Sequence, residues 1–177
     1  PSSATCALSP RPAARPETGT VTEPSLRVRV ITVSTRAAAG EYEDLSGPAI
    51  AEELRQWGAP AADLQVVTDD EATIVAALRD AVTSGVDAVL TTGGTGLAPD
   101  DRTPEATAQV IERPVPGIAE AIRSIGRDQG IPSAALSRAL AGTSERTLIV
   151  NLPGSVGGAR DGVAVVGPLL AHARDQL

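Results

Sequence analysis

The sequence is short of several residue types. Its 177 residues include no Phe, no Met and no Lys, and only one each of Trp, Tyr, His and Cys. A folded core must therefore be packed with Ala, Val, Ile and Leu. Proteins that bind single-stranded nucleic acids stack bases on aromatic rings in a basic groove. The scarcity of rings and the net charge of −7 argue against nucleic acid as a partner.

The missing side chains also exclude whole chemistries. Without Lys there can be no Walker A loop, Schiff base or lysine general base. His172 is the only histidine and lies near the carboxyl end, which argues against a Ser-His-Asp triad or a His-rich zinc site. Cys6 has no partner for an internal disulfide, which fits a reducing, cytoplasmic location. No run of about 18 apolar residues is present, so no membrane span is expected.

Composition divides the chain into two parts. Residues 1–25 are rich in Pro, Ala, Ser and Thr without periodicity, which predicts a disordered or loosely attached tail. This segment lacks the apolar centre of a secretory signal. Residues 26–177 have the length and composition of one globular domain.

From residue 26 onwards, strand and helix patterns alternate. Apolar, β-branched runs predict buried strands over residues 27–34, 64–68, 87–92 and 147–152. Helices are expected from 47 to 58, from 70 through 82, from 103, over 118–128 and over about 162–176. This alternation predicts an α/β fold with three layers, in which a mostly parallel, doubly wound sheet carries helices on both faces.

Ligands of such sheets bind where the strands end at their carboxyl termini. One predicted strand runs there into TTGGTGLAPDDRTPEAT, residues 91–107. Glycines after a strand let backbone N–H groups approach a phosphate, and Thr95 adds a hydroxyl group. The segment matches neither the Rossmann fingerprint nor the P-loop. A tight turn that needs glycine for its own geometry is an equally good explanation.

Two carboxylates follow strand ends. Asp70 could simply cap a helix, and Asp101 could be a solvated turn residue. Together, beside a phosphate-binding loop, they could hold Mg²⁺ through carboxylate oxygens and substrate phosphates. Arg36, Arg123 and Arg138 are candidate phosphate clamps, although most surface arginines are only solvated.

The stretch Leu90–Thr107, LTTGGTGLAPDDRTPEAT, resembles the MogA/MoaB group of molybdopterin-binding proteins, which includes the G domain of gephyrin. The resemblance extends over about Arg27 to Leu177. The supporting stretches, in the family's order, are STRAAAGEYEDLSG (34–47), VTDDE (67–71), VPGIAE (115–120), ALSR (135–138) and IVNLPGS (149–155).

The resemblance implies a molybdopterin adenylyltransferase of molybdenum cofactor biosynthesis. Such enzymes use the molybdopterin phosphate to attack the α-phosphorus of ATP, require Mg²⁺, form trimers and supply a separate molybdenum-insertion protein. Asp70 and Asp101 match two aspartates that are important in the family, and they are the predicted catalytic and Mg²⁺-binding residues. The predicted substrate- and nucleotide-binding residues are Thr92, Gly93, Gly94, Thr95, Gly96, Glu105, Ser137, Arg138, Asn151, Pro153, Gly154 and Ser155.

The chain departs from the family at some positions. Thr35 stands where many relatives have Asp, and no Lys follows the LPGS segment, so a phosphate contact could be lost or pass to Arg160. These departures keep open a non-catalytic paralogue that binds molybdopterin or assembles with partners. A third hypothesis is a related domain of nucleotide-salvage or competence-associated proteins, which shares the fold.

Overall fold

The computed structural model describes residues 25–177, so the predicted tail lies, except for Ser25, outside the described residues. The predicted α/β architecture is confirmed: one sheet has the strand order β2-β1-β3-β6-β5-β4. Its strands are β1 (Val28–Val33), β2 (Asp63–Val67), β3 (Ala88–Thr92), β4 (Arg113–Pro114), β5 (Ala141–Ser144) and β6 (Thr147–Leu152). The first four in this order are mutually parallel, and β5 and β4 add an antiparallel edge.

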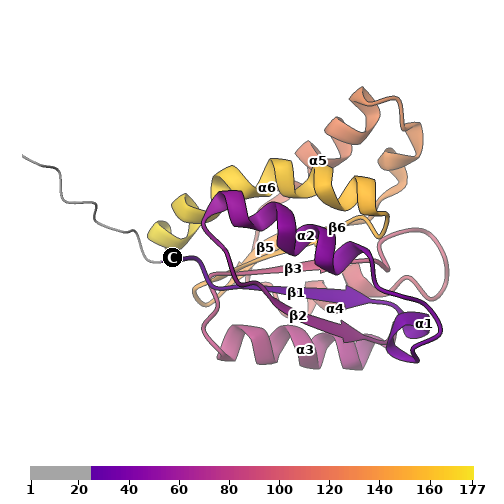
Figure 1. The fold of residues 1–177 in the computed structure, drawn as a ribbon, viewed down its shortest axis with the longest axis horizontal. Coiled ribbons are helices and arrows are strands. Elements are labelled where there is room, and N and C mark those ends of the chain that lie inside the picture. Colours follow the sequence, from indigo (N-terminus) through magenta and orange to yellow (C-terminus); the bar gives the residue numbers. More distant parts are fainter. Residues whose placement is uncertain (1–24) are drawn as a thin grey trace, which may run out of the picture.

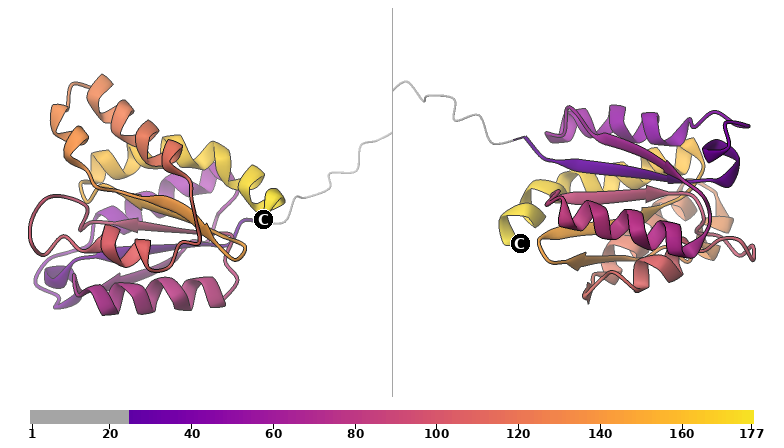
Figure 2. Two further views of the ribbon diagram at one scale, coloured as in Figure 1. Left: turned by 180° about the vertical axis from the view of Figure 1, so that it is seen from behind. Right: turned by 90° about the horizontal axis from the view of Figure 1, so that it is seen from below.

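Helices cover both faces of the sheet (Figures 1 and 2). The helical elements are α1 (Thr35–Ala38), α2 (Ser46–Leu54), η1 (Arg55–Trp57), α3 (Glu71–Thr83), α4 (Thr103–Ala108), α5 (Pro116–Asp128), η2 (Pro132–Leu136) and α6 (Val156–Gln176). One apolar core joins the sheet to α2, α5 and α6, and a second joins it to α3 and α4. None of the helices in the described part is long and apolar enough to cross a membrane.

Aliphatic side chains build both cores. In β1, Val30 belongs to the core under α2 and α6, while Ile31 belongs to the core over α3. Successive side chains of a strand point to opposite faces, so a run of apolar residues is buried on both sides. Two glycines let α6 approach β6 and η1 closely. An added Cβ at Gly162 would meet Leu152 of β6, and one at Gly167 would meet Trp57 of η1.

Several elements differ from the prediction. The antiparallel strands β4 and β5 were not predicted, because one is only two residues long and the other consists of small residues without apolar alternation. Residues 35–38 form a short helix where a loop was expected, with the Ser34 side chain accepting a hydrogen bond from the Ala37 N–H. The last helix begins at Val156 rather than at 162, after Ser155 caps it.

The register brings four strand ends to one edge. Thr92 of β3 lies opposite Thr32 of β1 and Leu152 of β6, and Thr32 lies opposite Val66 of β2. The segments that follow β1, β2, β3 and β6 therefore begin side by side. The segments after β2, β3 and β6 carry most of the predicted site residues, whereas Ser137 and Arg138 lie between η2 and β5.

Candidate functional site

The turn after β3 is built around two glycines in the left-handed backbone region. Gly93 has φ +97° and Gly94 has φ +61°. A Cβ at Gly93 would clash with the Val33 carbonyl oxygen, and one at Gly94 would clash with the Thr103 hydroxyl. The Thr103 hydroxyl also donates a hydrogen bond to the Gly93 carbonyl (2.9 Å). The turn therefore needs both glycines for its own geometry, as one of the two sequence interpretations held.

A cavity of about 540 Å³ lies between this turn, α5 with η2, and the start of α6. Seven of the binding residues predicted from the sequence line this cavity: Gly94, Thr95, Gly96, Ser137, Pro153, Gly154 and Ser155. Leu97, Ile122 and Leu136 give it an apolar wall. Asp101 and Arg123 are among its charged lining residues. The cavity thus combines an apolar surface, such as a ring system needs, with a few polar groups.

A second hollow of about 290 Å³ lies on the other side of the same turn. The predicted residues Thr92 and Gly93 line it, together with Ser34 and Tyr42. Gly154 and Ser155 line both hollows. The two hollows therefore meet at the segment that leads into α6.

The start of α6 offers free backbone donors at this junction. The Ser155 hydroxyl accepts a hydrogen bond from the Gly158 N–H (3.2 Å). Within the described chain, no acceptor is assigned to the N–H groups of Val156 and Gly157. Unsatisfied N–H groups and the helix dipole make a helix start a favourable place for a phosphate. Here it coincides with the wall shared by both hollows.

Asp101 faces the larger cavity. Its Oδ2 accepts a hydrogen bond from the Ala98 N–H (2.9 Å), which closes a tight turn within the loop. No hydrogen bond or ion pair within residues 25–177 is assigned to Oδ1. Asp101 can therefore hold the loop with one oxygen and offer the other to a ligand.

Asp70 has a different setting. It is the N-cap of α3, and its Oδ2 accepts hydrogen bonds from the N–H and the hydroxyl of Thr73 (both 2.8 Å). The hydrogen bond from the Thr73 hydroxyl is the main cause that lowers the Asp70 pKa, and the hydrogen bond from the Thr73 N–H is the second. Asp70 lines an open hollow with Glu71, Arg79 and Gln109, whereas Asp101 lines the cavity. The structure does not bring the two carboxylates into one hollow, and no cluster of three metal-ligating side chains occurs in its described part.

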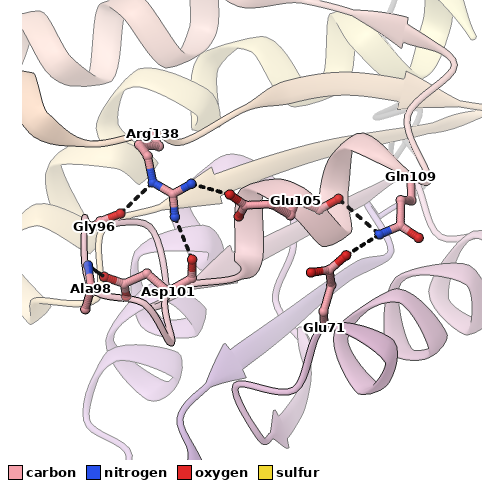
Figure 3. A network of polar contacts seen from close by, with 7 residues as sticks. All are labelled: Glu71, Gly96, Ala98, Asp101, Glu105, Gln109 and Arg138. Atoms are coloured by element: carbon pink, nitrogen blue, oxygen red, sulfur yellow. Dashed lines mark hydrogen bonds and ion pairs between the residues drawn. The ribbon is translucent and has the colours of Figure 1, made fainter.

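Arg138 and Glu105 form a half-buried ion pair with each other (Figure 3). The Arg138 guanidinium donates to the Gly96 and Asp101 carbonyl oxygens (2.6 and 2.5 Å) and to the Glu105 carboxylate. The hydrogen bond from Arg138 is the main cause that lowers the Glu105 pKa. Neither side chain lines the larger cavity. Three of the five guanidinium N–H groups of Arg138 thus donate within the protein, and the structure does not place this side chain in the cavity where the predicted phosphate clamp would act.

Asn151 has a structural position. It is fully buried, and its Nδ2 donates to the hydroxyls of Thr91 and Thr107 (both 2.9 Å). Its Oδ1 accepts from the Leu140 N–H (3.0 Å). The prediction that Asn151 binds substrate is wrong here, since no part of its amide is open to a ligand. The Thr92 hydroxyl is likewise committed, donating to the Pro153 carbonyl (2.8 Å).

The remaining arginine candidates differ in which hollow they lie beside. Arg123 lines the larger cavity, and its Nη1 donates to the Ser137 and Ala139 carbonyl oxygens (3.3 and 3.1 Å). Arg36 stacks over the Tyr42 ring (5.4 Å), beside the smaller hollow. Arg160 faces Glu53 of α2 (3.6 Å) and lines neither hollow. Of the three, Arg123 is the one placed to meet an anion in the larger cavity.

Sequence reasoning missed two polar contacts of the first loop. Thr35, which stands where many relatives have Asp, forms a reciprocal pair with Asp69: its N–H donates to the carboxylate (2.7 Å) and its hydroxyl accepts from the Asp69 N–H (3.1 Å). Asp44 accepts from the Thr32 hydroxyl (2.7 Å) and from the Ser46 and Gly47 N–H groups (both 3.0 Å). An acid two residues before a helix is the signal that could have indicated Asp44.

The chain is similar in sequence to known proteins. Residues 29–172 match the family described as a probable molybdopterin binding domain. A Helicobacter pylori (strain J99) molybdopterin adenylyltransferase is 36% identical, with 85% of this chain and 87% of that protein covered. A molybdenum cofactor biosynthesis bifunctional protein of Synechococcus elongatus is 44% identical over 81% of this chain, which spans 45% of that protein.

Solved structures agree with the sequence matches. The Mycobacterium ulcerans molybdopterin biosynthesis Mog protein superposes with a TM-score of 0.80 at 46% identity, covering 86% of this chain and 99% of that one. A MogA structure gives the same TM-score at 48% identity, with 85% and 98% covered. By its sequence match and by this shared architecture, the chain belongs to the MogA/MoaB family of molybdopterin-binding domains.

Proposed function

We propose that this protein is a molybdopterin adenylyltransferase of molybdenum cofactor biosynthesis. The observation that carries the proposal is the junction of two hollows at the start of α6, where Gly154 and Ser155 line both. A helix start favours phosphate, and adenylyl transfer joins two substrates through their phosphates. The relatives named molybdopterin adenylyltransferase, at 36–38% identity, support the assignment.

In the proposed reaction, an oxygen of the molybdopterin phosphate attacks the α-phosphorus of ATP. The bond to the bridging oxygen of the β-phosphate breaks, and pyrophosphate leaves with the electron pair. The nucleophile is already ionised, so no Lys, His or Ser is needed to activate it. The protein's task is to align the phosphates and to balance their charge. Arg123 and the free N–H groups of Val156 and Gly157 are the groups proposed for that task.

Magnesium is the proposed cofactor. Mg²⁺ binds through one or two carboxylates and substrate phosphates, and Asp101 fits this use with the oxygen that the Ala98 N–H does not occupy. Bound Mg²⁺ would neutralise phosphate charge. Asp70 is retained as a proposed functional residue, acting from the neighbouring hollow at the end of β2. We further propose a cytoplasmic homotrimer that passes its product to a molybdenum-insertion protein.

The direct test is pyrophosphate release by the full chain with ATP, Mg²⁺ and molybdopterin. We expect release that depends on all three components. The matched variants are Asp101→Asn, which should lose turnover, and Asp100→Asn, which changes an exposed neighbour and should not. Molybdopterin binding without pyrophosphate release in the unmodified chain would instead identify the non-catalytic paralogue. Sedimentation at three times the 17.9 kDa chain mass would support the trimer.

A further inference from the structure

Arg138 contacts both ends of the loop that carries Asp101. Its backbone N–H donates to the Thr95 carbonyl (2.9 Å), and its guanidinium donates to the carbonyls of Gly96 (2.6 Å) and Asp101 (2.5 Å). The loop thus begins and ends on one side chain. A planar guanidinium with donors in fixed directions is suited to this geometry, whereas a lysine ammonium is not.

The loop has little else to hold it. Between Gly96 and Asp101, the remaining hydrogen bonds of the described residues are internal: the Ala98 N–H donates to the Asp101 carboxylate (2.9 Å), and the Asp101 N–H donates to the Ala98 carbonyl (3.0 Å). Leu97 is 64% exposed. An internal turn fixes the shape of the loop but not its place on the protein. That place depends on Arg138.

Glu105 holds the guanidinium from the opposite side (Figure 3). One turn later on the same face of the α4 segment, the Gln109 amide donates to the Glu71 carboxylate (2.6 Å). Glu71 is the residue after Asp70. A continuous polar network therefore runs from the Asp101 loop through α4 to the start of α3, which Asp70 caps.

Resting on the proposed function, we infer that Arg138 is a positioning residue. Locked by Glu105, it fixes the 96–101 loop so that the Asp101 carboxylate faces the larger cavity, and it contacts no substrate itself. The Gln109–Glu71 hydrogen bond contributes less to the same network, because it is exposed to solvent. The helix that it contacts is also capped already, by the hydrogen bond between Asp70 and Thr73. Arg138 and Glu105 act as one unit in this inference.

Amide hydrogen exchange on the free full-length chain tests the loop without any substrate. We expect the amides of residues 96–101 to exchange about tenfold or more faster in Arg138→Gln and Glu105→Gln, because local opening becomes easier. Arg138→Lys should behave like Arg138→Gln, since an ammonium cannot bridge the loop. The control is Arg146→Gln, an exposed arginine in the β5–β6 turn at the opposite end of β6. Unchanged exchange in all variants would overturn the inference.

Kinetics then separate positioning from binding. For Arg138→Gln we expect kcat to fall about 100-fold, because small misplacements of a reacting group cost that much, with KM for ATP within about threefold of the unmodified value. Adding Glu105→Gln should cause little further loss. A large KM rise with kcat retained would mean that Arg138 binds phosphate, and a lower Tm with kcat retained would mean a purely structural role. Either result overturns the inference. Absence of turnover in the unmodified chain would refute the proposed function, while the exchange result would still stand.

Discussion

The two strand-to-helix junctions that carry the candidate aspartates are built differently. After β2, Asp70 precedes α3 directly and uses its carboxylate to cap that helix. After β3, the chain makes a glycine turn and a loop before α4, and Asp101 uses one oxygen to close the loop while facing the larger cavity. No glycine is needed at the first junction, and Gly93 and Gly94 are needed at the second.

The difference shows how context assigns a role to a carboxylate. Both aspartates accept a backbone N–H three residues away in sequence, Thr73 for Asp70 and Ala98 for Asp101. Asp70 uses one oxygen to cap its own helix, whereas Asp101 uses one oxygen to close a loop that Arg138 holds from outside. A side chain positioned by a distant residue can be aimed at a ligand without breaking a helix start.

The largest effect expected is on turnover in Asp101→Asn. Loss of the charge should reduce pyrophosphate release about 10²–10³-fold, as removal of one preorganised electrostatic group commonly does. The amide oxygen of Asn can still accept from the Ala98 N–H, so the melting temperature should stay within about 1 °C of the unmodified value. Steady-state kinetics beside thermal unfolding measure both. Retained turnover would remove Asp101 from the metal-binding proposal.

The next effect concerns the glycine turn. Gly93→Ala should lower the free energy of unfolding by about 2–4 kcal/mol, because its φ is strained for alanine and its Cβ meets the Val33 carbonyl. The control is Gly117→Ala in α5, where nothing lies within 4 Å of an added Cβ. That control should be neutral or slightly stabilising. Urea unfolding of both variants measures the contrast, and equal stability would contradict the close approach of β1 to this turn.

A smaller effect is expected at the first junction. Asp70→Ala should lower the melting temperature by about 2–4 °C through loss of the cap, while Asp70→Asn should keep the melting temperature because Asn also caps well. If the charge of Asp70 contributes to the reaction, Asp70→Asn loses turnover at least about tenfold, which corresponds to one modest electrostatic contact. Unchanged turnover would confine Asp70 to capping.

The smallest effect is the pH dependence of the Arg138–Glu105 pair. Because Arg138 lowers the Glu105 pKa below its ordinary value of 4.5, the pair stabilises the fold above that pH. This contribution is lost as pH falls through the lowered pKa. The stability difference between the unmodified chain and Glu105→Gln should therefore be largest near neutral pH and vanish in more acidic solution. Urea unfolding at a series of pH values from 7 downward measures it, and a difference that does not shrink on acidification would rule out the charged pair as its source.

Much of the fold could be predicted from periodicity. The buried runs of β1, β3 and β6 and the apolar stripe of α3 gave correct elements within one or two residues. The antiparallel edge could not be predicted, because Arg113–Pro114 and Ala141–Ser144 have no apolar pattern and their pairing joins segments that are distant in sequence. The start of α6 was placed too late, because Gly157 and Gly158 have low helix propensity and the Ser155 cap overrides it.

At the site, residue type alone indicated which loops meet but not what each side chain does. The string of glycines, acids and prolines after β3 and the LPGS segment after β6 pointed to the correct edge of the sheet. Arg138 and Asn151 have the chemistry of ligand-binding residues. In the folded chain, three of the five Arg138 guanidinium N–H groups donate to Gly96, Asp101 and Glu105, and both amide N–H groups of Asn151 donate to Thr91 and Thr107.

The sequence by itself determined the α/β architecture, the family and the edge of the sheet where the site lies, because hydrophobic periodicity and turn residues act locally along the chain. Only the tertiary structure decided which polar groups stay open to a ligand. Hydrogen-bond donors are consumed by whatever acceptors the fold brings near them, and those acceptors come from residues distant in sequence. For that reason Asp101 keeps one oxygen open beside the larger cavity, whereas Arg138 donates three of its five guanidinium N–H groups within the protein.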